Sequence, residues 1–208
     1  IETINGPAKN DVEQKEKFLK IIQVEAERMQ RLVNDTLSLT RVEESEYQTP
    51  NERVSLWYCA NSACDSVQTL ADKKNIKISF QKEYQKDEFF IKGNADQITE
   101  VFENLLDNAI TYSKDDTNIT IAFSEKEENI EFKIIDQGHG IPKDDIVRVS
   151  ERFFRSKTAN MYKKNSSGLG LAIVKHIINR HAGSLLIEST EGKGSTFTIT
   201  LPKFPASS

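Results

Sequence analysis

The sequence predicts an α+β protein, in which a two-layer α/β sandwich follows one long helix. Residues 11–46 contain neither Gly nor Pro, and their apolar residues recur with a helical period. From residue 54 onward, segments of helical period alternate with segments of period-two alternation. Helices and strands in these proportions are typical of helices packed on one face of a mixed sheet.

The composition excludes several classes of protein. The chain has 28 basic and 32 acidic side chains among 208 residues, with no run of like charge long enough to follow a phosphate backbone, so nucleic acid is not an expected partner. No apolar run approaches the roughly 18 residues of a membrane span. Cys59 and Cys64 lack the spacing of a metal or redox motif and are expected to be reduced, buried thiols. We therefore expect a soluble, cytoplasmic domain.

The predicted helix at 11–46 carries one apolar stripe, formed by Phe18, Ile22, Met29, Leu32, Val33, Thr36, Leu39 and Val42. A single helix of this length cannot fold alone, so the stripe must pack on another element. The turn residues Asn5, Gly6 and Pro7 favour an antiparallel hairpin with an upstream segment, completed as a dimeric bundle. The alternative is a helix folded back on its own domain.

Pro50 marks a linker at 47–53, and the compact domain follows it. We expect strands at 54–56, 76–80 and 89–92, helices at 57–72 and 96–112, and a hairpin with strands at 119–123 and 130–135. A helix at 169–181 and a hairpin at 184–188 and 196–201 close the fold. The stretch from 136 to 167 is rich in glycine and polar residues, with one short helix at about 144–149. Such a long irregular segment is typical of a lid or binding loop.

Asn104 and Asn108 lie four residues apart, so they share one face of the helix at 96–112. Amide groups can ligate a hard cation or donate to phosphate oxygens without adding negative charge. Alternatively, the two residues simply face water.

Asp136 begins the segment Asp136-Gln-Gly138-His-Gly140-Ile141-Pro142, directly after an apolar strand. A carboxylate there, followed by glycines that allow a flat ligand to approach, suits the exocyclic amine of adenine. Taken alone, the segment could equally be a turn.

Ser167-Gly168-Leu169-Gly170-Leu171 opens the helix at 169–181, where free backbone N–H groups and the helix dipole favour an anion such as a triphosphate. Glycines that serve helix packing are the alternative. A fourth segment, residues 191–197, joins the last two strands and could be an ordinary hairpin turn.

Taken in order, these segments resemble the asparagine box and the three glycine boxes of the histidine-kinase ATPase family, which is related to gyrase, chaperone and mismatch-repair ATPases. The resemblance covers residues 94–202, and Glu151-Arg152-Phe153-Phe154-Arg155 looks like the phenylalanine box of the kinases. Residues 27–35 and 39–43 look like the second helix of their dimerisation and phosphoacceptor hairpin. The resemblance implies a Bergerat-type ATP-binding fold, with residues 1–46 in the hairpin, 47–53 in the linker and 54–208 in the catalytic domain.

The resemblance also implies the site residues. Asn108 would ligate Mg²⁺, Asn104 would lie near the phosphates and Tyr112 would line the nucleotide site. Asp136 would accept the adenine amino group, helped through water by Ser195, while Gly138, Gly140 and Ile141 border the base. Arg155 would reach the γ-phosphate, and Gly168, Leu169, Gly170 and Leu171 would cradle the phosphates. Residues 142–167 would form the ATP lid.

Departures from the family pattern concern Ser166, where a glycine is frequent, and Thr111, where a lysine is frequent. The acceptor histidine of the family precedes this segment, and His139, His176 and His181 do not replace it. The implied enzyme is therefore a protein-histidine kinase fragment that passes phosphate to a response-regulator receiver domain, within a homodimer anchored at the bacterial inner membrane. Glu2 to Pro7 and Leu37 to Glu43 resemble the phosphate-starvation sensor kinases.

Two alternatives of other classes remain. The chain could be a non-catalytic dimeric scaffold, although its binding motifs are complete. It could also be an ATPase of the chaperone or mismatch-repair type, which needs a glutamate base such as Glu100 or Glu103 near Asn104.

Overall fold

The structure is a computed structural model that describes residues 12–44, 50–82, 89–156 and 167–205. The elements lie in the order α2 (Val12–Glu44), β1 (Glu52–Ser55), α3 (Leu56–Asp72), β2 (Lys77–Phe80), β3 (Phe90–Gly93), α4 (Ala95–Tyr112), β4 (Asn118–Lys126), β5 (Asn129–Ile135), α6 (Gly170–Arg180), β6 (Ser184–Thr190) and β7 (Gly194–Pro202). Each long element therefore lies within a few residues of its predicted place. The expected turn at 5–7 and residues 157–166 of the expected lid lie outside the described residues.

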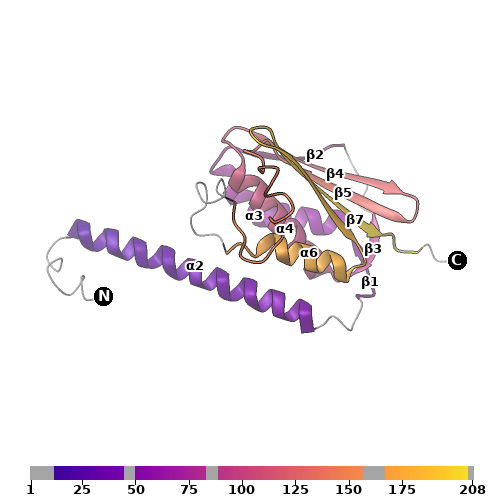
Figure 1. Cartoon of the computed structure of the whole chain (residues 1–208), viewed down its shortest axis with the longest axis horizontal. Coiled ribbons are helices and arrows are strands. Elements are labelled where there is room, and N and C mark those ends of the chain that lie inside the picture. The colour runs from indigo at the N-terminus through magenta and orange to yellow at the C-terminus, as the bar shows by residue number, and fades with distance from the viewer. Residues whose placement is uncertain (1–11, 45–49, 83–88, 157–166, 206–208) are drawn as a thin grey trace.

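Helices α3, α4 and α6 cover one face of a five-stranded sheet (Figure 1). The strand order is β2-β4-β5-β7-β6, and β2 is parallel to β4 whereas the other neighbours are antiparallel. Strands β1 and β3 pair separately in a small antiparallel sheet. The predicted α+β fold, a two-layer sandwich with a mixed sheet, is confirmed.

Side-chain caps fix where two of the helices begin. Ser55 accepts a hydrogen bond from the backbone N of Tyr58 at the start of α3, and Asn94 accepts one from the backbone N of Gln97 at the start of α4. Such caps satisfy backbone donors that the helix itself leaves unpaired. They set the register of α4, the helix that carries the asparagine pair.

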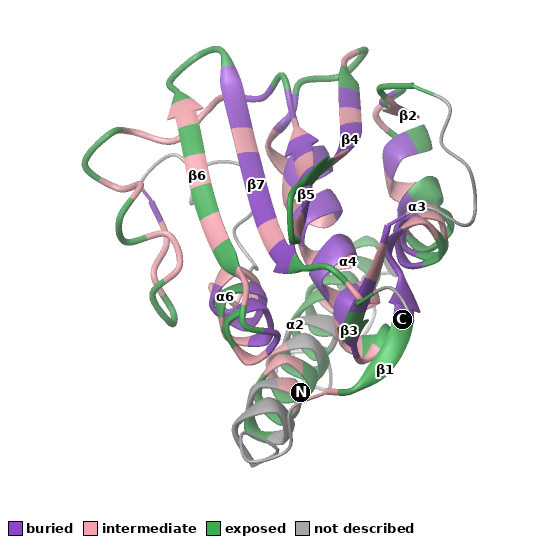
Figure 2. Ribbon diagram, turned by 90° about the vertical axis from the view of Figure 1, so that its right-hand side faces the viewer, coloured by how far each residue is buried: buried purple, intermediate pink, exposed green. Residues whose placement is uncertain are grey.

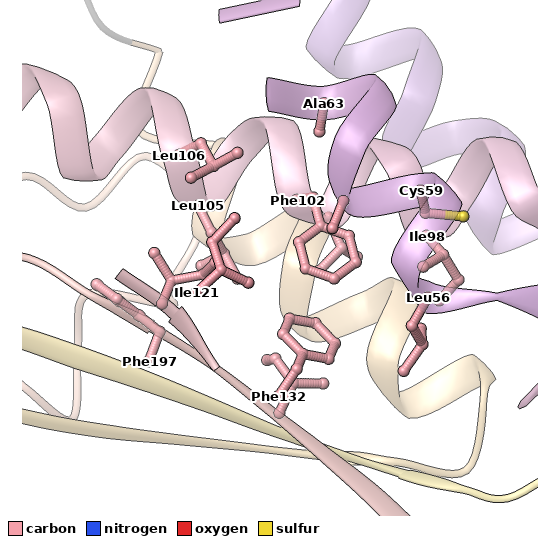
Figure 3. Packing of buried hydrophobic residues seen from close by; sticks show 14 of the residues in the cluster. Leu56, Cys59, Ala63, Ile98, Phe102, Leu105, Leu106, Ile121, Phe132 and Phe197 are labelled. Carbon is pink, nitrogen blue, oxygen red and sulfur yellow. The ribbon is translucent and has the colours of Figure 1, made fainter. Parts of the chain in front are cut away.

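The core lies between the sheet and the helices (Figure 3). Phe102 of α4 stacks on Phe132 of β5 with ring centroids 4.3 Å apart, and both side chains are fully buried. Each such burial contributes about 1.5–3 kcal/mol. Figure 2 shows that β7 is buried over most of its length, whereas the edge strand β6 alternates between exposed and half-buried residues. Burial of the apolar stripe of α4 in this core fixes the rotation of the helix about its axis, and therefore the position of its opposite face.

Helix α2 lies beside α6, and its N-terminal half extends beyond the rest of the molecule (Figure 1). Its apolar stripe is largely exposed, with Met29 and Val33 exposed by 67% and 56%. The side chains of Leu32, Asp35 and Ser38, three residues apart, are half-buried instead. Helix α2 therefore contacts its own domain, and the described half-buried residues of that contact are the apolar Leu32 and the polar Asp35 and Ser38.

No helix in the described part of the chain is long and apolar enough to cross a membrane.

The short helix predicted at about 144–149 is wrong, because residues 143–150 form consecutive turns. The backbone N of Val149 bonds to the carbonyl of Asp145 with α-helical spacing, but Arg148 bonds to the same carbonyl three residues back. One such turn does not offset the cost of helix nucleation.

Candidate nucleotide-binding site

One cavity of about 260 Å³ gathers residues from α4, the loop after β5, the start of α6, the start of β7 and α2. Its walls consist of Asp35, Asn104, Asp107, Asn108, Tyr112, Asp136, His139, Gly140, Ile141, Val149, Phe154, Arg155, Ser156, Ser167, Gly168, Gly170, Leu171, Ser195 and Phe197. Segments that are far apart in the sequence therefore meet around a single volume.

Helix α4 supplies three wall residues at intervals of four, namely Asn104, Asn108 and Tyr112. The amide nitrogen of Asn104 donates a 2.9 Å hydrogen bond to the carbonyl oxygen of Glu100, one turn earlier. The amide oxygen of Asn104 lies against Gly170, where a Cβ atom would come within 2.6 Å of it. The first turn of α6 thus packs directly on the asparagine face of α4, and any side chain at position 170 would separate them.

Asp136 is the buried carboxylate of the cavity, with 7% of its surface exposed. Its Oδ1 accepts hydrogen bonds from the backbone N of Gly138 at 2.8 Å and of Ser195 at 3.1 Å. Burial raises the pKa of Asp136 above its usual 3.8, and the two backbone donors lower it in part. Since both bonds end on Oδ1, Oδ2 can accept a hydrogen bond from a ligand amine.

The loop after Asp136 is tied to the β6–β7 hairpin. The backbone N of Ile141 donates to Ser189 Oγ at 2.8 Å, and Ser189 Oγ lies 2.9 Å from Ser195 Oγ. Gly140 has φ +68, and a Cβ atom there would meet the carbonyl oxygen of Thr190 at 2.2 Å. The segment at 191–197 is therefore more than a turn, because it places Ser195 beside Asp136.

The N-terminus of α6 forms the polar end of the cavity. Its N-cap residue, Leu169, makes no side-chain cap hydrogen bond. Gly168, Gly170 and Leu171 line the cavity, and Ser167 Oγ accepts a 3.1 Å bond from the backbone N of Leu169. The first N–H groups of a helix and its dipole together favour an anion. This end of the cavity therefore suits phosphate groups.

Residues 151–156 form the wall next to α6. The backbone N of Phe153 donates a 3.0 Å hydrogen bond to the carbonyl oxygen of Gly168, which ties the segment to the start of the helix. Phe154 lines the cavity and lies under the guanidinium of Arg148, 4.3 Å from its ring centroid. Arg155 follows Phe154 and also lines the cavity. A permanent positive charge thus stands on the wall near the helix N-terminus.

The cavity brings together most of the residues that the sequence indicated. Gly138 and Leu169 do not line it: a Cβ atom on Gly138 would meet the carbonyl oxygen of Tyr112 at 2.6 Å, and Leu169 is fully buried. Both serve the packing of the chain itself. The sequence interpretation missed Asp35, Asp107, His139, Val149, Phe154, Ser156, Ser167 and Phe197 as wall residues. Most of these lie within the recognised motifs, but no local signal connects Asp35 of α2 to them.

The walls also fit a magnesium ion bound to phosphate. In residues 12–44, 50–82, 89–156 and 167–205, no group of three or more His, Cys, Asp or Glu side chains could hold a metal. Mg²⁺ needs no such cage, since one or two protein oxygens, water and substrate phosphates complete its coordination. Asn108 offers a neutral amide oxygen for this purpose, and Asp107 is a wall residue beside it.

The histidines and cysteines play other parts. His181 is buried and hydrogen-bonded within the packing of the domain. His139 lines the cavity, and burial followed by the charges of Lys114 and Lys74 lowers its pKa. Cys59 and Cys64 are free thiols. Burial raises the pKa of both, that of Cys64 to about 11, so they remain protonated at neutral pH.

The geometry agrees with the relationships of the chain to known proteins. Residues 93–205 match the family described as histidine kinase-, DNA gyrase B- and HSP90-like ATPase. The chain is 35% identical over 188 residues to sensor histidine kinase WalK of Bacillus subtilis, covering 89% of this chain and 30% of that protein. It is 34% identical over 180 residues to the phosphate regulon sensor protein PhoR of Pseudomonas aeruginosa, covering 86% of this chain and 40% of that protein.

The chain thus spans less than half the length of these two curated relatives. The structure of full-length ShkA in complex with AMPPNP resembles it in fold, with a TM-score of 0.73 at 18% identity, over 94% of this chain and 40% of that one. A phosphate regulon sensor protein is among the relatives, in agreement with the resemblance at residues 2–7 and 37–43. The chain belongs to the histidine kinase-, DNA gyrase B- and HSP90-like ATPase family.

Proposed function

We propose that this chain is the ATP-handling part of a sensor protein-histidine kinase in a two-component system. Residues 54–208 would form the catalytic domain, 47–53 the linker and 1–46 the second helix of the dimerisation hairpin with the turn before it. The observation that supports this proposal best is the single cavity, which combines a buried carboxylate, an asparagine pair and an open helix N-terminus. These groups match the base, the metal-bound phosphates and the phosphate tail of one adenine nucleotide.

Each end of the nucleotide has its own partners in this proposal. Asp136 Oδ2 accepts the adenine amino group, with Ser195 helping through water, while Tyr112, Gly140 and Ile141 border the base. Asn108 holds Mg²⁺, Asn104 lies near the phosphates, and the backbone N–H groups of Gly168, Gly170 and Leu171 donate to phosphate oxygens. Gly138 and Leu169 support the site from behind the cavity wall.

Transfer of the γ-phosphoryl group would proceed to an imidazole nitrogen of a histidine on the partner helix of the hairpin. The nitrogen forms a bond to phosphorus while the bond to the bridging oxygen breaks, and ADP leaves with the electron pair. Arg155 offsets the negative charge that develops on the transferring group. The bound magnesium supplies further charge neutralisation. The chain itself mainly holds the reacting groups in line.

The same proposal names the partners. The phosphoryl group would pass to an aspartate of a response-regulator receiver domain. Because Ile22, Met29 and Val33 of the apolar stripe of α2 are exposed in the single chain, they are available for the hairpin and a second protomer. The full-length protein would be anchored at the bacterial inner membrane, with this part in the cytoplasm.

Calorimetric titration with Mg²⁺ and AMPPNP tests the site. Asp136→Asn removes the charged acceptor, and Asn108→Ala removes the metal ligand, so each should weaken binding by about ten- to a hundredfold. The matched control is Asn118→Ala, an exposed asparagine on β4 away from the cavity walls, which should bind as the parent does. Parent-like binding in both site variants would refute the proposal.

A water-using ATPase of the chaperone or mismatch-repair type is less well supported. Glu100 is the first of its two suggested bases, and its Oε1 accepts a hydrogen bond from Ser38 Oγ of α2. Neither Glu100 nor Glu103 lines the cavity. Incubation with radiolabelled ATP separates the classes: the kinase proposal expects neither phosphohistidine nor phosphate release from this chain alone. Steady release of inorganic phosphate would support the ATPase, and failure to bind nucleotide would support the scaffold.

A further inference from the structure

Helix α2 reaches into the nucleotide site through a carboxylate. Oδ2 of Asp35 accepts a hydrogen bond from Ser167 Oγ at 2.5 Å, and Asp35 is a wall residue of the cavity. One turn further along the helix, Ser38 Oγ donates to Oε1 of Glu100 at 2.5 Å. The first contact joins α2 to the segment before α6, at the phosphate end of the cavity, and the second joins α2 to α4.

The carboxylate of Asp35 lies near the N-terminus of α6, where a bound anion would be expected. Ser167 Oγ donates to Asp35 and accepts from the backbone N of Leu169, at the start of the helix. A phosphate oxygen near Ser167 and Gly168 would require the same hydroxyl donor and would lie close to the carboxylate. Two anions at such a distance repel each other, because little water separates them to screen their charges.

The contact of α2 with the rest of the chain is suited to release. The half-buried residues on its contact face include the polar Asp35 and Ser38, whereas the apolar Val33 and Leu37 are exposed by 56% and 49%. Hydrogen bonds such as those of Asp35 and Ser38 contribute only a small net free energy, because hydrogen bonds to water replace them on release. A charged ligand could therefore shift this helix.

We propose that Asp35 is an internal competitor of the terminal phosphate, so that docking of α2 and binding of a nucleoside triphosphate oppose each other. This inference rests on the proposed function of the cavity. The chain would then discriminate nucleotides by the charge of their phosphate tail. This linkage is reciprocal. If binding of the triphosphate favours release of α2 by a given factor, then any event that draws α2 away from α6 raises the affinity for the triphosphate by the same factor.

The test compares Asp35→Asn with the parent chain in titrations with Mg²⁺ and AMPPNP, with ADP, and with adenosine. The asparagine keeps an oxygen that can accept from Ser167, so the substitution removes only the charge. We expect AMPPNP to bind about three- to tenfold more tightly, ADP to gain less, and adenosine to bind unchanged. Glu16→Gln removes one negative charge from an exposed position on the same helix, about 28 Å away along its axis, and should leave all three affinities unchanged.

Two results would overturn the inference. Unchanged or weaker binding of AMPPNP to Asp35→Asn would show that the carboxylate does not oppose the phosphate. An equal gain for all three ligands would show that the effect does not depend on phosphate charge. Failure of the proposed function is distinguishable, because Asp136→Asn would then leave the affinity for adenosine and for both nucleotides at the parental values.

Discussion

The backbone N of Asn94 donates a 3.1 Å hydrogen bond to Nε2 of His181, and this bond joins the start of α4 to the end of α6. Nδ1 of the same ring lies 2.8 Å from the carbonyl oxygen of Ile177. Since Nε2 accepts, the ring proton resides on Nδ1 and is donated to that carbonyl. The neutral imidazole therefore connects two helices that both contribute walls to the nucleotide site.

His181 should make folding stability depend on pH. Burial lowers its pKa below the usual 6.5, and the charge of Arg180 acts in the same direction. The unfolded chain consequently takes up a proton near pH 6.5 before the folded chain does. The stabilising effect of His181 is complete above that pH and is lost as the pH falls toward the lower folded pKa. Urea unfolding between about pH 5 and pH 8 measures this dependence.

The matched variants for that measurement are His181→Gln and His176→Gln. His181→Gln should lower the free energy of unfolding at neutral pH by about 1–3 kcal/mol and flatten its decline below pH 6.5. His176→Gln, on the same helix, should keep the decline of the parent. An equally steep decline in His181→Gln would assign the pH dependence to other groups.

Asp136 should set the pH dependence of nucleotide affinity. Burial raises the pKa of its carboxyl, so the group protonates at a higher pH than an ordinary aspartate does. A protonated carboxyl is a poorer acceptor for the adenine amine, so the affinity of the parent should fall as the pH is lowered toward the raised pKa of Asp136. Titration with AMPPNP at several pH values checks this expectation, with Asp136→Asn showing a weaker dependence.

Asp136→Asn should also separate binding from stability. The raised pKa means that the folded chain holds the charged form at a cost, and this cost is present at neutral pH and lost as the pH falls through the raised pKa. The asparagine removes the charge but keeps an oxygen for Gly138 and Ser195. Urea unfolding at neutral pH should therefore show stability at least equal to that of the parent. Marked destabilisation would indicate a structural role.

Gly140 and Gly192 form a natural pair for measuring steric conflict. Both have positive φ, +68 and +79, but a Cβ atom on Gly140 would meet the carbonyl of Thr190 at 2.2 Å, whereas one on Gly192 would have no neighbour within 4 Å. Gly192→Ala should cost about 1 kcal/mol through backbone strain alone. Gly140→Ala should cost about 1–3 kcal/mol more, measured by urea unfolding. Equal costs would contradict the close approach of the loop to β6.

Lys74 should stabilise the end of α4. Its Nζ donates to the carbonyl oxygens of Ile110, Thr111 and Ser113 at 2.9, 2.8 and 3.0 Å. A cation is favourable at a helix C-terminus, where these carbonyls lack helical partners. Lys74→Met should lower the free energy of unfolding by about 1–3 kcal/mol. The neighbouring Lys73 is exposed, and Lys73→Met should change stability by less than about 0.5 kcal/mol.

Local patterns predicted most of the elements because their causes are local. The stripe of α4 from Ile98 to Ile110 has a helical period, and the cap at Asn94 precedes it. The period-two alternation of β4 and β5 likewise follows from burial of one sheet face. The short helix at 144–149 failed because a few turn-forming residues do not specify whether a second helical turn will follow. The order of the strands also could not be read from these patterns, since pairing joins distant segments.

By itself, the sequence determined the class of fold, the chemistry of the binding segments and their order along the chain. These features depend on residue type and on short spacings in the sequence. Local backbone geometry alone determines which of these residues share a helix or strand face and where the chain turns. Only the tertiary structure decided that Gly138 and Leu169 serve packing, that His139 stands on the cavity wall, and that Asp35 of a separate helix meets Ser167. Each depends on how α2, α4 and α6 pack, and packing is a contact between surfaces that no single segment encodes.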